Sequence, residues 1–260
     1  MTKSTFKKKF LPWLLPIVII LFWQLAVQLK WIQSEFLPAP TEVVQTAIVD
    51  WKKGILQKNI SISLFRATCG FVIGGGMGFI LGLLSGTSKL FRKTFDSTIQ
   101  MLRTIPNMAL IPLVVLILGI GEPAKICFVA LACLFPMYIN TYHGITSIDP
   151  DLLEMGKSYQ LNTVQMFKQI IFPGALPTIL MGVRYALGTM WTALIVAETV
   201  SADSGIGYMS TNAQQYVDVK TIYLCIIIYA FLGELSNYIA KNLETIFLEW
   251  RNSARSLTEE

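Results

Sequence analysis

Long apolar runs without a charged residue constrain this chain more than any other feature. Phe10 to Leu29 forms one such run, and Ala67 to Ser88 and Ile126 to Ile148 form two more. A helix needs about 20 mostly apolar residues to cross the hydrocarbon core of a bilayer. Each run is long enough for one crossing, so the sequence predicts an integral membrane protein.

Three further segments complete a predicted bundle of about six crossings. Thr104 to Gly121 is uncharged, Gly174 to Ala197 carries only Arg184, and Thr221 to Ala240 carries only Glu234. Inside lipid a helix satisfies its own backbone N–H and C=O groups. The predicted fold class is therefore all-α, a polytopic transmembrane helical bundle.

The first run invites a second interpretation, because Lys7, Lys8 and Lys9 precede it as they would precede a secretory signal. The run is longer than a signal peptide core, and no small-residue cleavage site follows it. We therefore expect a retained first helix.

Composition supports a membrane protein and argues against a nucleic-acid partner. Only 14% of the residues are charged, the mean hydropathy is +0.56 and the formal charge is +5, whereas a soluble domain has roughly 25% charged residues. No basic helix or aromatic–basic platform exists outside the apolar runs. The excess of Lys and Arg instead fits loops on the cytoplasmic side of a membrane.

The distribution of these basic residues predicts the orientation of the bundle. With the N-terminus inside, thirteen Lys and Arg lie on the cytoplasmic side, seven lie outside and Arg184 lies within a span. This bias favours both termini in the cytoplasm.

The second run carries a regular packing signal. Five glycines recur every fourth residue and fall along one stripe of a helix; they are Gly70, Gly74, Gly78, Gly82 and Gly86. Close backbone approach promotes helix association in lipid, so we expect this stripe to be buried against another helix. The adjacent triplet 74–76 leaves open a second role in flexing the helix.

Prolines in the third and fourth runs predict kinks. Pro106, Pro112 and Pro136 each remove a backbone hydrogen bond from a span. Kinked helices often line pathways, but many are purely structural, and the sequence leaves both roles open.

The sequence shows no set of residues with the spacing of a catalytic or metal-binding site. Cys69, Cys127, Cys133 and Cys225 lie in apolar runs without ligand spacing, and His143 is the only histidine. The tripeptide Gly156-Lys157-Ser158 resembles the end of a phosphate-binding loop. However, Asp151 occupies the position of the first glycine, and the tripeptide falls in a predicted helix. We expect no catalytic residue, no metal site and no resident cofactor.

A polar stretch between the fourth and fifth runs predicts a helical hairpin in the cytoplasm. Asp149 can cap a first helix, and Asn162 with Gln165 forms a capping-box pattern at the start of a second. Leu152, Met155 and Tyr159 share one face of the first helix. Phe167, Ile170 and Ile171 give the second an apolar side, and Pro173 is expected to end it. Such an exposed apolar face needs a protein partner or the membrane surface.

This hairpin resembles the EAA loop of permease subunits of ATP-binding-cassette importers. Glu154 matches the glutamate of that motif, Phe167 its aromatic residue and Pro173 its closing proline. Met155 and Gly156 replace the two alanines. Gln160 stands where the family has glycine, so a left-handed turn there costs roughly 1–2 kcal/mol. The resemblance implies an ATPase-coupling surface that includes Glu154, Met155, Gly156, Tyr159, Gln160, Asn162, Phe167 and Pro173.

The resemblance extends over most of the chain, from about Leu37 onward. The segments 173–177, 182–188, 195–201 and 205–213 are similar to permeases of the aliphatic sulfonate, taurine and nitrate branch, with the sulfonate permeases most similar. The resemblance implies a type I importer fold in the inner cell membrane. It also implies a substrate that is a small anion, such as an aliphatic sulfonate. Taurine, nitrate or bicarbonate, and a thiamine precursor are the alternatives.

The same resemblance implies the partners and the domain organisation. It implies a second permease copy, separate ATPase subunits that bind the ATP, and an extracytoplasmic substrate-binding protein. We expect an N-terminal anchor helix and outer loop over 1–66, a permease core over 67–241 with the coupling loop at 149–173, and a cytoplasmic tail over 242–260.

Charges inside the predicted spans need partners, because a charge at the bilayer centre costs about 2.5–3.5 kcal/mol. Arg184 and Glu198 are about 21 Å apart along one helix and cannot pair. Arg184 is a candidate contact in the substrate path; the alternatives are a backbone carbonyl partner or a snorkelling side chain. Glu198 and Asp203 are expected to hold the turn before Gly205. Glu234 is expected to snorkel or to pair across the bundle.

Rival classes make different demands on the sequence. A secondary transporter or channel would work without an ATPase, but carriers usually show two matching halves, and none is visible. A membrane-embedded enzyme would need a Ser/His, His/Glu or paired-Asp constellation at membrane depth. A pure scaffold would leave the kinked spans and the cytoplasmic hairpin without a purpose. The permease interpretation accounts for all of these features.

Overall fold

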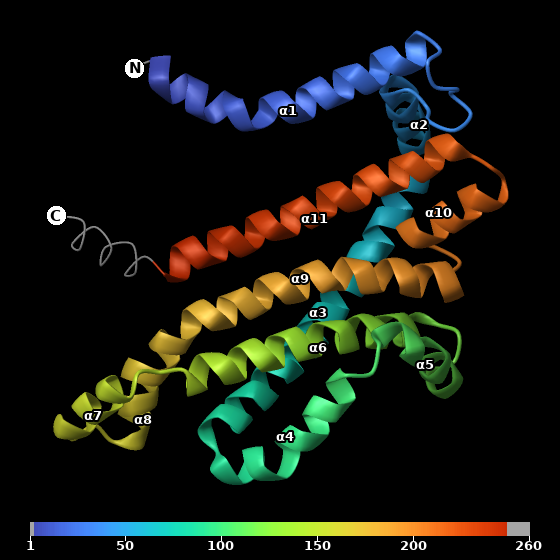
Figure 1. The fold of residues 1–260 in the computed structure, drawn as a ribbon. Helices are drawn as coiled ribbons and strands as arrows, with labels where there is room; N and C mark the ends of the chain where they lie inside the picture. Colours follow the sequence, from blue (N-terminus) through green and yellow to red (C-terminus); the bar gives the residue numbers. More distant parts are fainter. Residues whose placement is uncertain (1–2, 249–260) are drawn as a thin grey trace.

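The computed structural model describes residues 3–248, which are helical apart from short connections (Figure 1). The helices are α1 (Lys3–Gln28), α2 (Pro40–Lys52), α3 (Ile55–Thr87), α4 (Lys89–Arg103), η1 (Asn107–Leu110), α5 (Ile111–Leu118), α6 (Glu122–Thr146), α7 (Pro150–Ser158), α8 (Thr163–Met166), η2 (Phe167–Ile171), α9 (Phe172–Ser201), α10 (Ile206–Gln215) and α11 (Val219–Phe247).

The long helices run back and forth between two ends of a bundle. The start of α1, the end of α11, and α7 with α8 lie at one end, here called the inner end. Helices α2 and α10 lie at the opposite, outer end (Figure 1). This arrangement matches the predicted alternation of crossings and places both ends of the described chain on one side.

Four helical segments in residues 3–248 are long and apolar enough to cross a membrane. They are Ile55–Thr87, Glu122–Thr146, Thr163–Val200 and Val219–Phe247, and a bent pair formed by α4 and η1–α5 raises the number to five. Leu14–Gln28 in α1 is a shorter apolar helix. The first of these segments begins well before the predicted start at Ala67, because Ile55–Arg66 continues the same helix.

The third predicted span differs from a continuous helix. Helix α4 and the segment Asn107–Leu118 meet at an angle of 93°. Pro106 lies at the break, and a proline both lacks an N–H and disfavours a helical conformation at the residue before it. Pro112 sits in the first turn of α5, where proline is tolerated.

The glycine stripe of α3 packs against the backbone of α6, as predicted. A Cβ atom at Gly74 would overlap the carbonyl oxygen of Ala130, and one at Gly78 would overlap that of Leu134. Gly76 faces open space, so the triplet is not uniformly buried. The helix continues through the triplet without a break.

Pro136 lies inside α6, and α9 compensates for the hydrogen bond that it removes. Proline at position 136 leaves the carbonyl of Ala132 without its helical N–H partner. The Thr189 hydroxyl of α9 lies 3.2 Å from that carbonyl, and it shares its proton with the carbonyls of Tyr185 at 3.2 Å and Ala186 at 3.1 Å on its own helix. Pro136 therefore contributes a polar contact between two spans.

Candidate functional site

The helical hairpin predicted from the sequence is present at the inner end of the bundle. Asp149 accepts a hydrogen bond from the N–H of Asp151 at 3.0 Å and caps α7. Asn162 accepts from the N–H of Gln165 at 2.9 Å, and the Gln165 side chain accepts from the N–H of Asn162 at 3.0 Å. Both expected caps are confirmed.

The first arm of the hairpin is α7, and the second arm is α8 with η2. Helix α7 packs on the second arm through a glycine, which has no side chain. Gly156 is buried, and a Cβ atom there would lie 2.7 Å from Ile170 and 2.8 Å from Met166. The face of α7 beside Gly156 is largely uncovered, since Leu152, Met155 and Tyr159 are 45%, 46% and 75% exposed. Glu154 is also exposed. The hairpin thus presents an apolar surface with an acidic residue beside it.

Gln160 adopts the left-handed conformation expected at the family's glycine position. Its φ is +55°, and its N–H donates to the carbonyl of Lys157 at 2.9 Å. The N–H of Leu161 donates to the carbonyl of Gly156 at 3.1 Å. These two bonds form a Schellman motif, which ends α7. The turn therefore keeps its geometry although glutamine replaces glycine.

The predicted helix end at Pro173 is wrong. The second arm continues through Pro173 into α9, and Thr163–Val200 is one helical segment. A π-helical turn at Phe167–Ile171 precedes the proline, and the Phe172 N–H donates to the carbonyl of Phe167. A proline in a regular helix clashes with the carbonyl four residues earlier. The wider π turn changes the hydrogen-bond register just before Pro173, which lets the helix continue.

Arg184, the candidate for the substrate path, contacts a neighbouring span. Its Nη2 lies 2.8 Å from Oε2 of Glu244 on α11. The partner is a carboxylate, whereas a carbonyl or a snorkelling position had been considered. Glu234 is exposed on α11 and accepts from Asn237 at 3.3 Å, so its polar partner in the described structure lies on its own helix.

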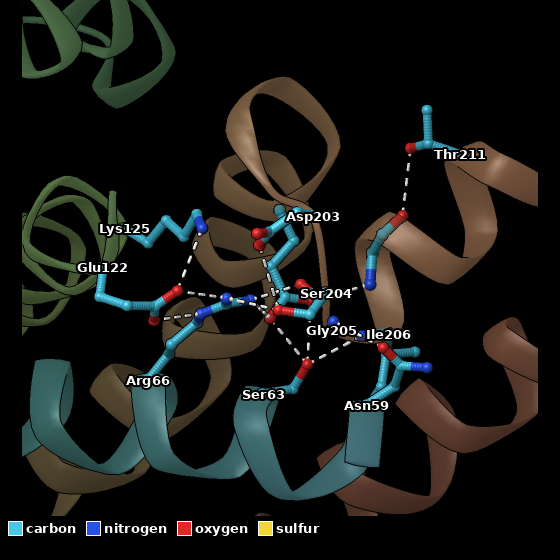
Figure 2. A network of polar contacts seen from close by, with 12 residues as sticks. Asn59, Ser63, Arg66, Glu122, Lys125, Asp203, Ser204, Gly205, Ile206 and Thr211 are labelled. Atoms are coloured by element: carbon cyan, nitrogen blue, oxygen red, sulfur yellow. Dashed lines mark hydrogen bonds and ion pairs between the residues drawn. The ribbon is translucent and has the colours of Figure 1, made fainter. Parts of the chain in front are cut away.

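A second polar cluster lies at the outer end, where α3, α6 and the α9–α10 turn meet (Figure 2). Arg66 is fully buried and pairs with Glu198 of α9 at 2.8 Å and with Glu122 of α6. The same guanidinium donates to the carbonyl of Ser204 at 2.6 Å. Lys125 adds a bond to Glu122 at 3.1 Å. One arginine thereby joins three elements.

Glu198 holds the start of α10, as expected. It accepts from the N–H of Gly207 at 2.8 Å, and from the Ser63 hydroxyl at 2.7 Å. Gly205 has a φ of +111°, and a Cβ atom there would overlap the Glu198 carboxylate. Asp203 has a smaller part, accepting only from Ser204 at 3.3 Å.

Sequence reasoning missed the role of Arg66, which it had assigned to the outer loop. A signal for its burial does exist. Asn59, Ser63 and Arg66 lie four, then three residues apart and fall on the helix face that carries Gly70 and Gly74. Polar residues that continue a glycine packing stripe point toward the same neighbouring helices.

Within residues 3–248, no group of three or more His, Cys, Asp or Glu side chains is arranged to hold a metal ion. The four cysteines are free, and Cys133 and Cys225 are buried.

Comparison with known proteins identifies the class of this chain. Residues 75–247, more than half of the chain, match the family described as the binding-protein-dependent transport system inner membrane component. The chain belongs to this family. It is the permease component of an ATP-binding-cassette importer, a multi-pass membrane protein and a transport subunit, not an enzyme.

Two relatives share much of its sequence. The SsuC protein of Escherichia coli (strain K12) is 49% identical over 95% of this chain and 94% of its own length. The SsuC protein of Bacillus subtilis (strain 168) is 40% identical over 92% of this chain and 87% of its own length. Both are named for aliphatic sulfonate transport. A crystal structure of an amino acid ABC transporter shares the fold, with a TM-score of 0.63 at 16% identity over 76% of this chain and 96% of that one.

Proposed function

We propose that this permease imports aliphatic sulfonates. The observation that carries the proposal is the 49% identity, over nearly the full length of both chains, to a relative named for sulfonate transport. The taurine permease TauC of Escherichia coli (strain K12) is 27% identical and the nitrate permease NrtB of Synechocystis sp. is 28% identical. The resemblance is therefore much stronger to the sulfonate branch than to either alternative.

The proposed assembly pairs two copies of this chain with two ATPase subunits and an extracytoplasmic binding protein. The exposed face of α7, with Glu154 beside it, is the surface that the ATPase binds. The inner end faces the cytoplasm, because the excess of Lys and Arg is on that side. The binding protein delivers its substrate to the outer end.

The continuity of the second arm with α9 supports the proposed coupling mechanism. Because Thr163–Val200 is one helical segment, a displacement of the hairpin by a closing ATPase moves the inner part of a membrane span directly. ATP binding to the partner then biases the permease between two arrangements, with the hairpin as the link.

The test is uptake by a reconstituted complex. We would co-express the chain with the ATPase subunit and the binding protein of its importer, and measure ATP-dependent uptake of labelled ethanesulfonate into proteoliposomes. Taurine and nitrate serve as competing substrates. Uptake of ethanesulfonate that either competitor inhibits only weakly supports the proposal. Uptake of taurine or nitrate in its place, or uptake without any ATPase, would overturn it.

A matched variant tests the coupling surface in the same assay. Glu154→Lys reverses the exposed charge beside the apolar face and is expected to lower uptake while leaving the folded permease intact. Unchanged coupling of ATP hydrolysis to uptake in this variant would count against the assigned surface.

A further inference from the structure

A cavity lies at membrane depth, next to the break between α4 and η1. It has a volume of about 160 Å³ and lies between the break, α6 and α9. This volume equals about five water molecules in liquid water, so the cavity has room for a sulfonate group. Its lining residues are Asn107, Met108, Phe128, Ala132, Thr189, Thr192, Ala193 and Val196.

Non-helical backbone inside a membrane is tolerated where it is buried in protein or lines a water-filled cavity. The break at Pro106 is such a segment. Asn107 follows it and lines the cavity. The side chain of Asn107 has no hydrogen-bond partner within residues 3–248. Asn107 therefore offers an unused donor beside the break.

Helix α9 contributes a further unused donor. Thr192 is exposed in this single chain, and its hydroxyl has no hydrogen-bond partner within residues 3–248. Thr189 differs, because its hydroxyl already donates to the carbonyl of Ala132. Thr192 lies roughly 12 Å from the outer end of the span at Val200, which is near the middle of a bilayer.

A second hollow lies along the polar face of α4. An open groove of about 910 Å³ runs along this helix. It is lined by Lys89, Arg92, Lys93, Asp96, Ser97, Gln100, Met101 and Thr104, and so ends close to the break. Asp96 accepts a hydrogen bond from the Tyr138 hydroxyl at 2.8 Å. The three cations at the inner end would attract an anion leaving the cavity.

We propose that the cavity binds the anionic head group of the substrate during transport, with the Thr192 hydroxyl and the Asn107 side-chain amide as hydrogen-bond donors. The inference rests on the proposed function and adds the position of the site. The donors are neutral, so they hold the anion weakly enough to release it toward the basic groove. Arg184 takes no part, because it is paired with Glu244 and does not line the cavity.

The experiment compares Thr192→Val with Thr199→Val in the reconstituted complex. Both changes remove a hydroxyl from α9, but Thr199 lies outside the cavity and already donates to the carbonyl of Val196 at 2.9 Å. We expect Thr192→Val to lower ethanesulfonate uptake about tenfold, as for the loss of a hydrogen bond to a charged group. Thr192→Ser restores uptake. Stimulation of ATP hydrolysis by the loaded binding protein stays unchanged in Thr199→Val, which lies outside the cavity.

A labelling experiment gives a second readout that does not depend on transport rate. Thr192→Cys in the assembled complex is expected to react with a thiol reagent that carries a sulfonate, and excess ethanesulfonate is expected to slow the reaction. The unmodified chain supplies the background from its four cysteines. If the wild type takes up ethanesulfonate, Thr192→Val and Thr199→Val take it up at equal rates, and ethanesulfonate does not protect the new cysteine, the proposed site is wrong. The proposed function would still stand. Absence of ethanesulfonate uptake by the wild type would instead overturn the proposed function.

Discussion

At the outer end, Arg66 and Glu198 are buried and bonded to groups from neighbouring elements. At the inner end, Leu152, Met155 and Tyr159 are between 45% and 75% exposed. The outer cluster satisfies its polar groups within one chain. The hairpin leaves apolar side chains exposed to solvent. Exposed apolar patches on a folded surface mark interaction sites. The difference indicates that the outer end is a fixed structure and that the inner end is completed by a partner.

The largest expected effect on stability comes from breaking the buried ion pair. Arg66→Met leaves Glu198 buried without its cation, and such a loss costs about 3–5 kcal/mol. We expect a large fall in the thermal unfolding temperature of the purified permease in detergent. The double variant Arg66→Met with Glu198→Leu should recover part of this loss, because it leaves no unpaired buried charge at position 198.

The exposed pair Lys220–Glu42 is the control at the same end of the molecule. Its atoms are 3.7 Å apart and its side chains are partly exposed, so Lys220→Met should cost less than about 1 kcal/mol. If Arg66→Met and Lys220→Met shifted the unfolding temperature equally, the outer cluster would not be the fixed structure described above.

A smaller effect is expected where the two arms of the hairpin meet. Gly156→Leu should cost about 1–3 kcal/mol by overpacking the contact with Ile170 and Met166. Gly156→Ala should be close to neutral, since the atoms it meets are ends of flexible side chains and alanine favours a helix by about 1 kcal/mol over glycine. Protease sensitivity of the 149–173 segment measures the difference. Equal sensitivity of both variants would mean that the arms are not packed through this residue.

Left-handed residues at the two ends provide a third comparison. Gln160 in the hairpin has a φ of +55° and Val217 between α10 and α11 has a φ of +57°. Replacement by glycine should relieve strain at both, by up to about 1 kcal/mol at position 160. Val217→Gly should gain more, because a branched side chain tolerates this conformation least. Unfolding temperatures of the two variants test the order, and a loss of stability at either position would contradict it.

Much of the fold was predictable because its signals are local. Apolar runs identify spans, the stripe from Gly70 to Gly86 identifies a packed face, and the caps at Asp149 and Asn162 identify helix starts. Each signal depends on residues within a few turns of one another. The left-handed turn at Gln160 was also predictable, since it was expected from the glycine at this position in the family motif.

The features that escaped prediction depend on tertiary contacts or on small changes of backbone register. Arg66 and Glu198 are separated by 132 positions, and neither position alone shows that they meet. Pro173 is a residue type that ordinarily ends a helix, but a π turn precedes it and the helix continues into α9. The 93° bend at Pro106 likewise reflects how α4 and α5 pack, whereas their apolar composition fits a straight span equally well.

The smallest expected effect on stability, and the sharpest test of the comparison, comes from the exposed face of the hairpin. Met155→Asp places a carboxylate on the exposed face of α7, where Met155 is 46% exposed. The free energy of unfolding should therefore change by only about 0.5 kcal/mol, as for most surface substitutions. Association with the ATPase subunit should nevertheless fall strongly, because the new charge would be buried in the interface without a partner. Co-purification of the two subunits measures this loss.

Lys157→Asp is the matched control, since it adds the same carboxylate two residues away on another side of α7. Its effect on co-purification should be smaller than that of Met155→Asp. If the hairpin binds the ATPase through the proposed face, Met155→Asp lowers co-purification without lowering the stability of the permease. Arg66→Met, by contrast, is expected to lower both stability and assembly. If Met155→Asp co-purified normally, or if it destabilised the permease as Arg66→Met does, the hairpin would be an ordinary structural element and the contrast between the two ends would fail.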